Sequence, residues 1–154
     1  MRYTRLMAVL LCCAATACAA DSFVGKWKVN LAKSEYKQGT PPKEQIVTMA
    51  EVGSDLTVRV EGVVADGSKT LVYYTIPLEG GPGKMFETSP AYDGISGKHL
   101  GPNEREIIRW KDGKAVFTAH STVSADGNSM VAITKGVSPL GKPVDAVIYY
   151  EKLK

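Results

Sequence analysis

Residues 112–127 read DGKAVFTAHSTVSADG, an alternating stretch enclosed by two Asp-Gly pairs. Successive side chains of a β-strand point to opposite faces of the sheet. In 114–124 one face would therefore carry small and apolar residues, namely Ala115, Phe117, Ala119, Ser121 and Val123. Asp-Gly pairs suit tight hairpin turns because glycine adopts a positive φ at little cost. The stretch predicts a half-buried strand that folds back on a neighbour at each end.

The same pattern continues along the chain from Phe23 onward. Short runs of β-forming residues alternate with turn residues, and no stretch keeps a helical period for ten or more residues. Strands are expected near 23–30, 44–52, 55–65, 70–78, 92–100, 103–111, 114–124, 129–137 and 144–153. We therefore predict an all-β domain, an antiparallel up-and-down meander of about 9–10 strands.

Two segments interrupt this pattern. Segment 31–43 is polar, ends in two prolines and has room for one helical turn, whereas segment 79–91 contains Gly80-Gly81-Pro82-Gly83-Lys84 and is expected to be a flexible loop. Neither is long enough to link two domains. A single domain over 21–154 is therefore expected.

Apolar residues occupy both faces of strands 44–52, 70–78 and 129–137. A meander with one wet face would not need them, so they favour two packed sheets or a closed barrel, which also removes exposed edges. Barrels of this size tend to enclose more space than side chains fill. Candidate lining residues are the aromatics on predicted inward faces, Trp110, Phe117 and Tyr150, together with Tyr74, whose face is ambiguous. The alternative for these aromatics is a filled core.

The first twenty residues have the composition of a secretory signal. Arg2 and Arg5 precede an apolar run over 6–11, and small residues fill 14–20. The stretch is shorter than the roughly 20 apolar residues that span a bilayer. We therefore expect 1–20 to be removed and the domain 21–154 to be exported, to the periplasm or the exterior.

All three cysteines, Cys12, Cys13 and Cys18, lie in this leader, so the exported domain is expected to lack thiols and disulfides. Two cleavage modes are open. An ordinary signal peptidase would release a soluble product, whereas Ala15-Thr16-Ala17-Cys18 resembles a bacterial lipobox, in which Cys18 would carry a membrane-anchoring lipid. Ala15 stands where a lipobox usually has a large aliphatic residue, which favours the soluble product.

The net charge of +3 belongs mostly to the leader. Of the 19 basic residues, Arg2 and Arg5 lie in the leader. The domain without the leader has 17 basic residues (19 − 2) and 16 acidic residues, so it is almost neutral. A neutral domain gives no electrostatic reason to expect nucleic acid or an anionic membrane as a partner.

No motif for catalysis or metal binding stands out. His99 and His120 lack a neighbouring cluster with metal-ligand spacing, and Glu104 and Glu106 are a carboxylate pair of a kind common on solvated strands. We therefore predict no metal, no cofactor and no enzymatic activity. An enzyme assembled from distant residues such as His99, His120 or Arg109 is the least favoured alternative.

Phe23-Val24-Gly25-Lys26-Trp27 resembles the opening of the lipocalin and fatty-acid-binding (calycin) superfamily, in which a G-x-W motif begins the first strand. The resemblance implies a barrel closed at one end by Trp27, with Lys152 as the late basic residue that packs over it. The T-D-Y motif and the long helix of classical lipocalins are missing. The longer string over 25–34, G-x-W-x-x-N-x-x-K-S, also resembles small uncharacterised bacterial secreted proteins.

Together these observations predict an exported, non-enzymatic protein that holds a small apolar or amphipathic ligand inside a lipocalin-like barrel. The expected ligand-binding residues are Tyr74, Trp110, Phe117 and Tyr150, and the expected barrel-closing residues are Gly25, Trp27 and Lys152. The alternative is a structural or interaction module of the bacterial cell envelope with a filled core.

Overall fold

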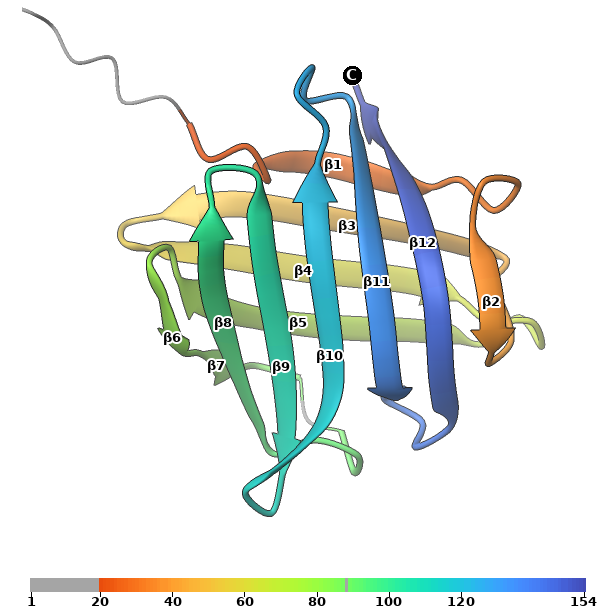
Figure 1. Ribbon diagram of the computed structural model, residues 1–154. Coiled ribbons are helices and arrows are strands. Elements are labelled where there is room, and N and C mark those ends of the chain that lie inside the picture. Colours follow the sequence, from red (N-terminus) through yellow and green to blue (C-terminus); the bar gives the residue numbers. More distant parts are fainter. Residues whose placement is uncertain (1–19, 88) are drawn as a thin grey trace, which may run out of the picture.

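The computed structural model describes residues 20–87 and 89–154. Within them every regular element is a β-strand, and all pairings are antiparallel (Figure 1). The strands are β1 (Gly25–Val29), β2 (Glu35–Gln38), β3 (Glu44–Val52), β4 (Asp55–Val63), β5 (Lys69–Pro77), β6 (Gly80–Pro82), β7 (Lys84–Met85), β8 (Gly94–Gly101), β9 (Glu104–Lys111), β10 (Lys114–Val123), β11 (Ser129–Val137) and β12 (Pro143–Leu153). The predicted all-β class is confirmed.

The strands form one sheet in the order β6-β8-β9-β10-β11-β12-β1-β3-β4-β5-β7. The last long strand pairs with the first, with Trp27 opposite Lys152 and Val29 opposite Tyr150. Apart from β5 and β8, long strands that follow each other in the chain also lie side by side, which is the predicted up-and-down meander. The sheet is a nearly closed barrel, interrupted at a seam between β5 and β8.

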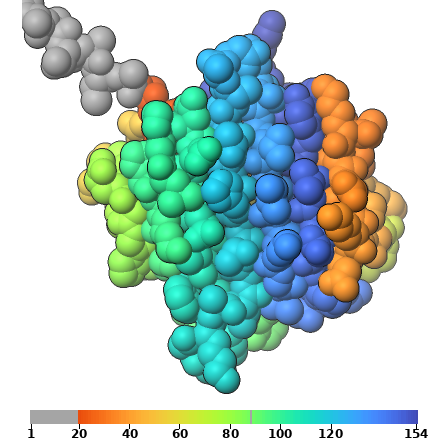
Figure 2. Space-filling model, viewed as in Figure 1, coloured from red at the N-terminus to blue at the C-terminus, as the bar shows by residue number. Residues whose placement is uncertain are grey.

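The barrel is flattened into two layers. β1 and β3–β5 form the back layer, and β8–β12 form the front layer, whose strands run across those behind (Figure 1). In the space-filling view the front layer is a continuous surface (Figure 2). The inward side chains of the two layers meet between them and form the core.

The hairpin turns follow the predicted chemistry. Asp112 and Gly113 have φ of 48° and 73°, and they join Lys111 directly to its partner Lys114. Positive φ at both turn positions matches the right-handed twist of the flanking strands. Gly127, in another predicted Asp-Gly turn, also has a positive φ of 69°.

The two segments expected to be irregular contain short strands, which corrects the sequence analysis. In 31–43, β2 pairs with β12 beyond the end of β1, with Tyr36 opposite Ala146. A short turn precedes β2, in which the amides of Lys33 and Ser34 donate to the carbonyl oxygens three residues earlier. In 79–91, β6 pairs with β8 and β7 pairs with β5, so this segment fills the seam. Its glycines allow the close approach: a Cβ on Gly83 would lie 2.2 Å from the carbonyl oxygen of Thr75.

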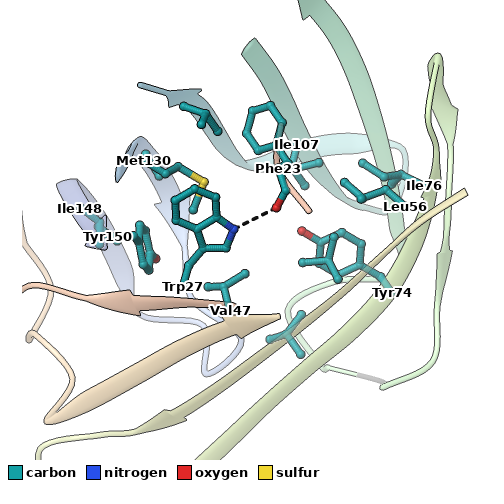
Figure 3. Close-up of a cluster of buried hydrophobic side chains, with 14 of the residues drawn as sticks. Phe23, Trp27, Val47, Leu56, Tyr74, Ile76, Ile107, Met130, Ile148 and Tyr150 are labelled. Atoms are coloured by element: carbon teal, nitrogen blue, oxygen red, sulfur yellow. Dashed lines mark hydrogen bonds between the residues drawn. The ribbon is translucent and has the colours of Figure 1, made fainter. Parts of the chain in front are cut away.

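The core lies between the layers (Figure 3). Its most deeply buried large side chains are Trp27, Phe23, Leu56, Ile76 and Met130. The inward position predicted for Tyr150 on the last long strand is confirmed, because this side chain is buried. Trp27 and Val58 are likewise buried, on the inward faces of β1 and β4.

The inward face predicted for Trp110 is wrong. Arg105, Ile107 and Arg109 are the buried, inward residues of β9, so alternation places Trp110 on the outer face. Its indole N–H donates a 2.9 Å hydrogen bond to the Ser96 hydroxyl of β8. Ile107 and Ile108 are both apolar, so the sequence left the phase of this strand open.

The predicted leader and its three cysteines fall in residues 1–19, outside the described residues, apart from Ala20 at its end. Among the described residues, no helix has the length and apolar character needed to cross a membrane.

Candidate functional site

One end of the barrel is closed by the segment that precedes β1. Phe23 is buried, and its carbonyl oxygen accepts a 2.9 Å hydrogen bond from the Trp27 indole N–H (Figure 3). Asp21 forms a salt bridge with Arg105, which also donates a 2.7 Å hydrogen bond to the carbonyl oxygen of Leu78. The side chains of Asp21 and Arg105 are only 14% and 4% exposed, so this pair is shielded from water. We call this group the closed end.

The residues expected to close the barrel meet here. The Lys152 ammonium lies 4.9 Å from the centroid of the Trp27 ring, within cation–π range. Gly25 makes room for it, because a Cβ at that position would lie 2.4 Å from Lys152 Cε. The backbone of Gly25 has φ of 140°, which side-chain-bearing residues rarely adopt.

A second arginine, Arg109, points into the barrel four residues further along β9. It is 7% exposed, and its guanidinium carbon lies 4.5 Å from the ring centroid of Phe117, 5.1 Å from that of Tyr92 and 5.6 Å from that of Tyr74. Among the described residues, no carboxylate lies within 4.0 Å of it, and its Nε has no hydrogen-bond partner. Within the described part of the chain, Arg109 is therefore a buried cation that lies against aromatic rings and has no carboxylate partner.

Phenol groups surround this cation. Burial raises the pKa of Tyr92 to about 12, with Arg109 acting in the opposite direction. Burial also raises the pKa of Tyr74 and that of Tyr150. Elsewhere in the barrel, the Tyr36 hydroxyl is buried with no hydrogen-bond partner among the described residues. At neutral pH the site thus offers one positive charge and several neutral hydroxyl groups, a set that suits an anion with an apolar body.

The other end of the barrel has a cleft of about 210 Å³, which we call the mouth. Its lining is mostly apolar and includes Val72, Met85, Pro90, Tyr92 and Leu140. Tyr92 belongs both to this lining and to the rings around Arg109. The mouth therefore adjoins the buried cation through one aromatic side chain.

The structure brings together most of the predicted lining. Tyr74 and Tyr150 are buried inside, and Phe117 lies beside Arg109, whereas Trp110 is outside. Sequence analysis missed Tyr92 as a site residue: it stands first in the strand expected over 92–100, whereas β8 begins only at Gly94. It also missed Arg109 as a binding residue, although the phase shared with Ile107 could have indicated an inward position.

The residues named for a dispersed enzyme site do not lie together in the structure. Arg109 is inward, but His120 lies opposite Glu106 on the outer face, and His99 is exposed near the β8–β9 turn. Among the described residues, no three His, Cys, Asp or Glu side chains are placed to hold a metal ion.

Comparison with known proteins gives limited guidance. No protein-family model matches the chain, and no curated protein matches it significantly. Among solved structures, it is similar to the zebrafish ileal bile acid-binding protein complexed with cholic acid. The match has a TM-score of 0.46 and 13% sequence identity, and it covers 86% of this chain and 99% of the zebrafish chain. This likeness is too distant to support an inference about the ligand.

Proposed function

We propose that this protein is a non-enzymatic carrier or receptor for a small amphipathic ligand that has an acidic group, exported by means of its leader. Arg109 carries the proposal. A buried charge without a counter-ion is costly, and cation–π contacts offset only part of that cost. A carboxylate, sulfonate or phosphate entering the barrel would supply the missing partner in a bidentate arrangement that guanidinium favours.

The apolar part of such a ligand has a suitable environment. Tyr74, Phe117 and Tyr150 supply aromatic walls near the cation, and the mouth continues them with Val72 and Met85. The neutral tyrosine hydroxyls can donate hydrogen bonds to the acidic group. These features favour an anion with an aliphatic or ring-shaped body over a fully polar metabolite.

A second candidate is a structural or interaction module of the cell envelope. The cleft of about 210 Å³ is smaller than typical ligand sites, which measure about 300–1,000 Å³. The core beneath it is well filled, as the exposures of 0–4% for Trp27, Tyr74, Ile76 and Tyr150 show. Binding would therefore require the mouth to widen.

Calorimetric titration with dodecanoate and with dodecanol tests the choice. Wild-type protein should bind the acid at least tenfold more tightly, because a hydrogen bond to a charged group contributes about 1.5–3 kcal/mol. Arg109→Met should abolish this preference and Arg109→Lys should retain part of it, while Arg59→Met, at a partly exposed outer arginine, serves as the control. Equal affinity for both probes would exclude the role of Arg109, and absence of binding would favour the structural module.

A further inference from the structure

Two loops meet at the mouth through side-chain hydrogen bonds. The Ser89 hydroxyl, in the segment between β7 and β8, donates to the carbonyl oxygen of Pro139 at 2.7 Å. The Tyr92 hydroxyl, from the same segment, donates to the carbonyl oxygen of Val137 at 2.5 Å. Pro139 lies between β11 and β12, and Val137 ends β11, so these bonds join the two sides of the opening.

These two hydrogen bonds can break while the strand pairings of the sheet remain intact. Both have a side-chain donor, and neither belongs to the strand pairings of the barrel. A net hydrogen bond of this kind contributes only about 1 kcal/mol. The loops can therefore separate while β11 and β12 remain paired from Ser129 opposite Glu151 to Val137 opposite Pro143.

Tyr92 connects this closure to the buried cation. Its hydroxyl holds Val137, while its ring covers Arg109 at 5.1 Å and packs at a tilt against Phe117 at 6.3 Å. An anion that approaches the guanidinium must share the space beside it with this ring. Movement of the ring would also carry the hydroxyl away from Val137, so occupancy of Arg109 and closure of the mouth oppose each other.

We propose that Ser89 and Tyr92 form a latch that holds the mouth closed in the empty barrel and opens when an acidic ligand reaches Arg109. The inference rests on the proposed function, and it explains how a cleft of about 210 Å³ can admit a larger ligand. Tyr92 is then a positioning residue: its latch bond determines how readily the ligand enters the empty barrel, and Arg109 makes the contact that holds the acidic group.

The test uses stopped-flow fluorescence with 8-anilinonaphthalene-1-sulfonate, an acidic aromatic probe, on wild type, Ser89→Ala, Tyr92→Phe and the double variant. Each variant keeps the residue's bulk and removes a latch hydroxyl. Loss of one bond of about 1 kcal/mol destabilises the closed, empty barrel, so it should raise the association rate about fivefold and lower the dissociation constant by about the same factor, with the dissociation rate changed less than twofold. Tyr73→Phe, on the outer face of β5 where its ring stacks on Phe86, is the matched control.

Amide hydrogen exchange supplies a readout that needs no ligand. In Tyr92→Phe, exchange should accelerate at Tyr92 and Gly141, whose amides are bonded within the two loops, and stay slow at Val58 in β4. Unchanged binding rates in the variants would overturn the latch and leave the binding function standing. If wild type does not bind the probe, the proposed function fails, and unchanged exchange would then overturn the latch as well.

Discussion

The two inward arginines of β9 differ in whether they have hydrogen-bonding partners, and this distinguishes a structural residue from a candidate functional one. Arg105, at the closed end, and Arg109, near the mouth, are both buried, both lie over aromatic rings and both have an Nε without a partner. Arg105 has the carboxylate of Asp21 and the carbonyl of Leu78, whereas Arg109 has neither kind of partner among the described residues. The same residue type on one strand is thus satisfied at one end and unsatisfied at the other.

This difference indicates which end of the barrel is fixed. A paired arginine stabilises the fold, and removing its partner leaves an uncompensated buried charge. An unpaired arginine contributes little to the fold and is available to a ligand. Four mutations or conditions test the contrast, described from the largest expected effect to the smallest.

The largest effect is expected from Asp21→Asn, which leaves the Arg105 cation buried without its counter-ion. The free energy of unfolding should fall by about 3–5 kcal/mol in urea denaturation. Asp93→Asn is the matched control, because the Asp93–Lys111 pair is 3.6 Å apart and its side chains are 43% and 39% exposed. Exposed pairs contribute about 0–1 kcal/mol. Similar losses in both variants would contradict the structural role of Arg105.

Alkaline pH should act on the mouth end. Burial raises the pKa of Tyr92 from 10.0 to about 12, so the unfolded chain releases this proton first as the pH rises. The native state then holds more protons than the unfolded state, and stability falls between pH 10 and 12 while this contribution is constant below pH 10. The contribution of Tyr92 to this loss should be about 2 kcal/mol, obtained by comparing wild type with Tyr92→Phe in urea denaturation at pH 9 and 12. Tyr92→Phe should reduce the slope, and an unaltered slope would refute the assignment.

A smaller effect is expected from Lys152→Met, which keeps the aliphatic stem over Trp27 and removes the charge. A cation–π contact of this kind contributes about 1 kcal/mol, so the free energy of unfolding should fall by about that amount. The emission of Trp27 should shift as well. Lys26→Met, a neighbouring exposed lysine on β1, should do neither. An equal response to both changes would remove Lys152 from the closed end.

The smallest effect on stability is expected from Arg109→Met. Removal of an unpaired buried charge offsets the lost cation–π contacts, so the free energy of unfolding should change by less than about 1 kcal/mol. Arg105→Met, at the paired position, should cost about 3 kcal/mol under the same conditions. Equal losses of stability for Arg109→Met and Arg105→Met in thermal denaturation would contradict this difference between the two arginines.

Alternation and Asp-Gly turns were sufficient to predict the long strands. Strands 44–52 and 129–137 have the bounds expected from the sequence, and Asp112-Gly113 forms the expected turn. The short strands could not be predicted, because their neighbours create them. β2 exists because β12 extends past β1, and β6 and β7 exist because Gly83 allows the seam to close.

The candidate site was predicted only in part, for reasons of phase. Phe117 and Tyr150 sit on strands with clear alternation, so their inward positions followed from the sequence. Trp110 comes shortly after Ile107-Ile108, two adjacent apolar residues that leave the phase of the strand open. Its outer position is fixed by the hydrogen bond to Ser96, a contact that no local pattern reveals. The binding role of Arg109 depends on the absence of a counter-ion, which is a property of the folded barrel.

The pairing of β1 with β12 has a consequence for the order of events during biosynthesis. It brings together residues such as Asn30 and Glu151, which are 121 positions apart, and closing a loop of that length is entropically costly and slow. A nascent chain that lacks 143–153 has no partner for this edge of β1, so the barrel cannot close before β12 has been synthesised. Until then the edge of β1 that faces β12 stays unpaired.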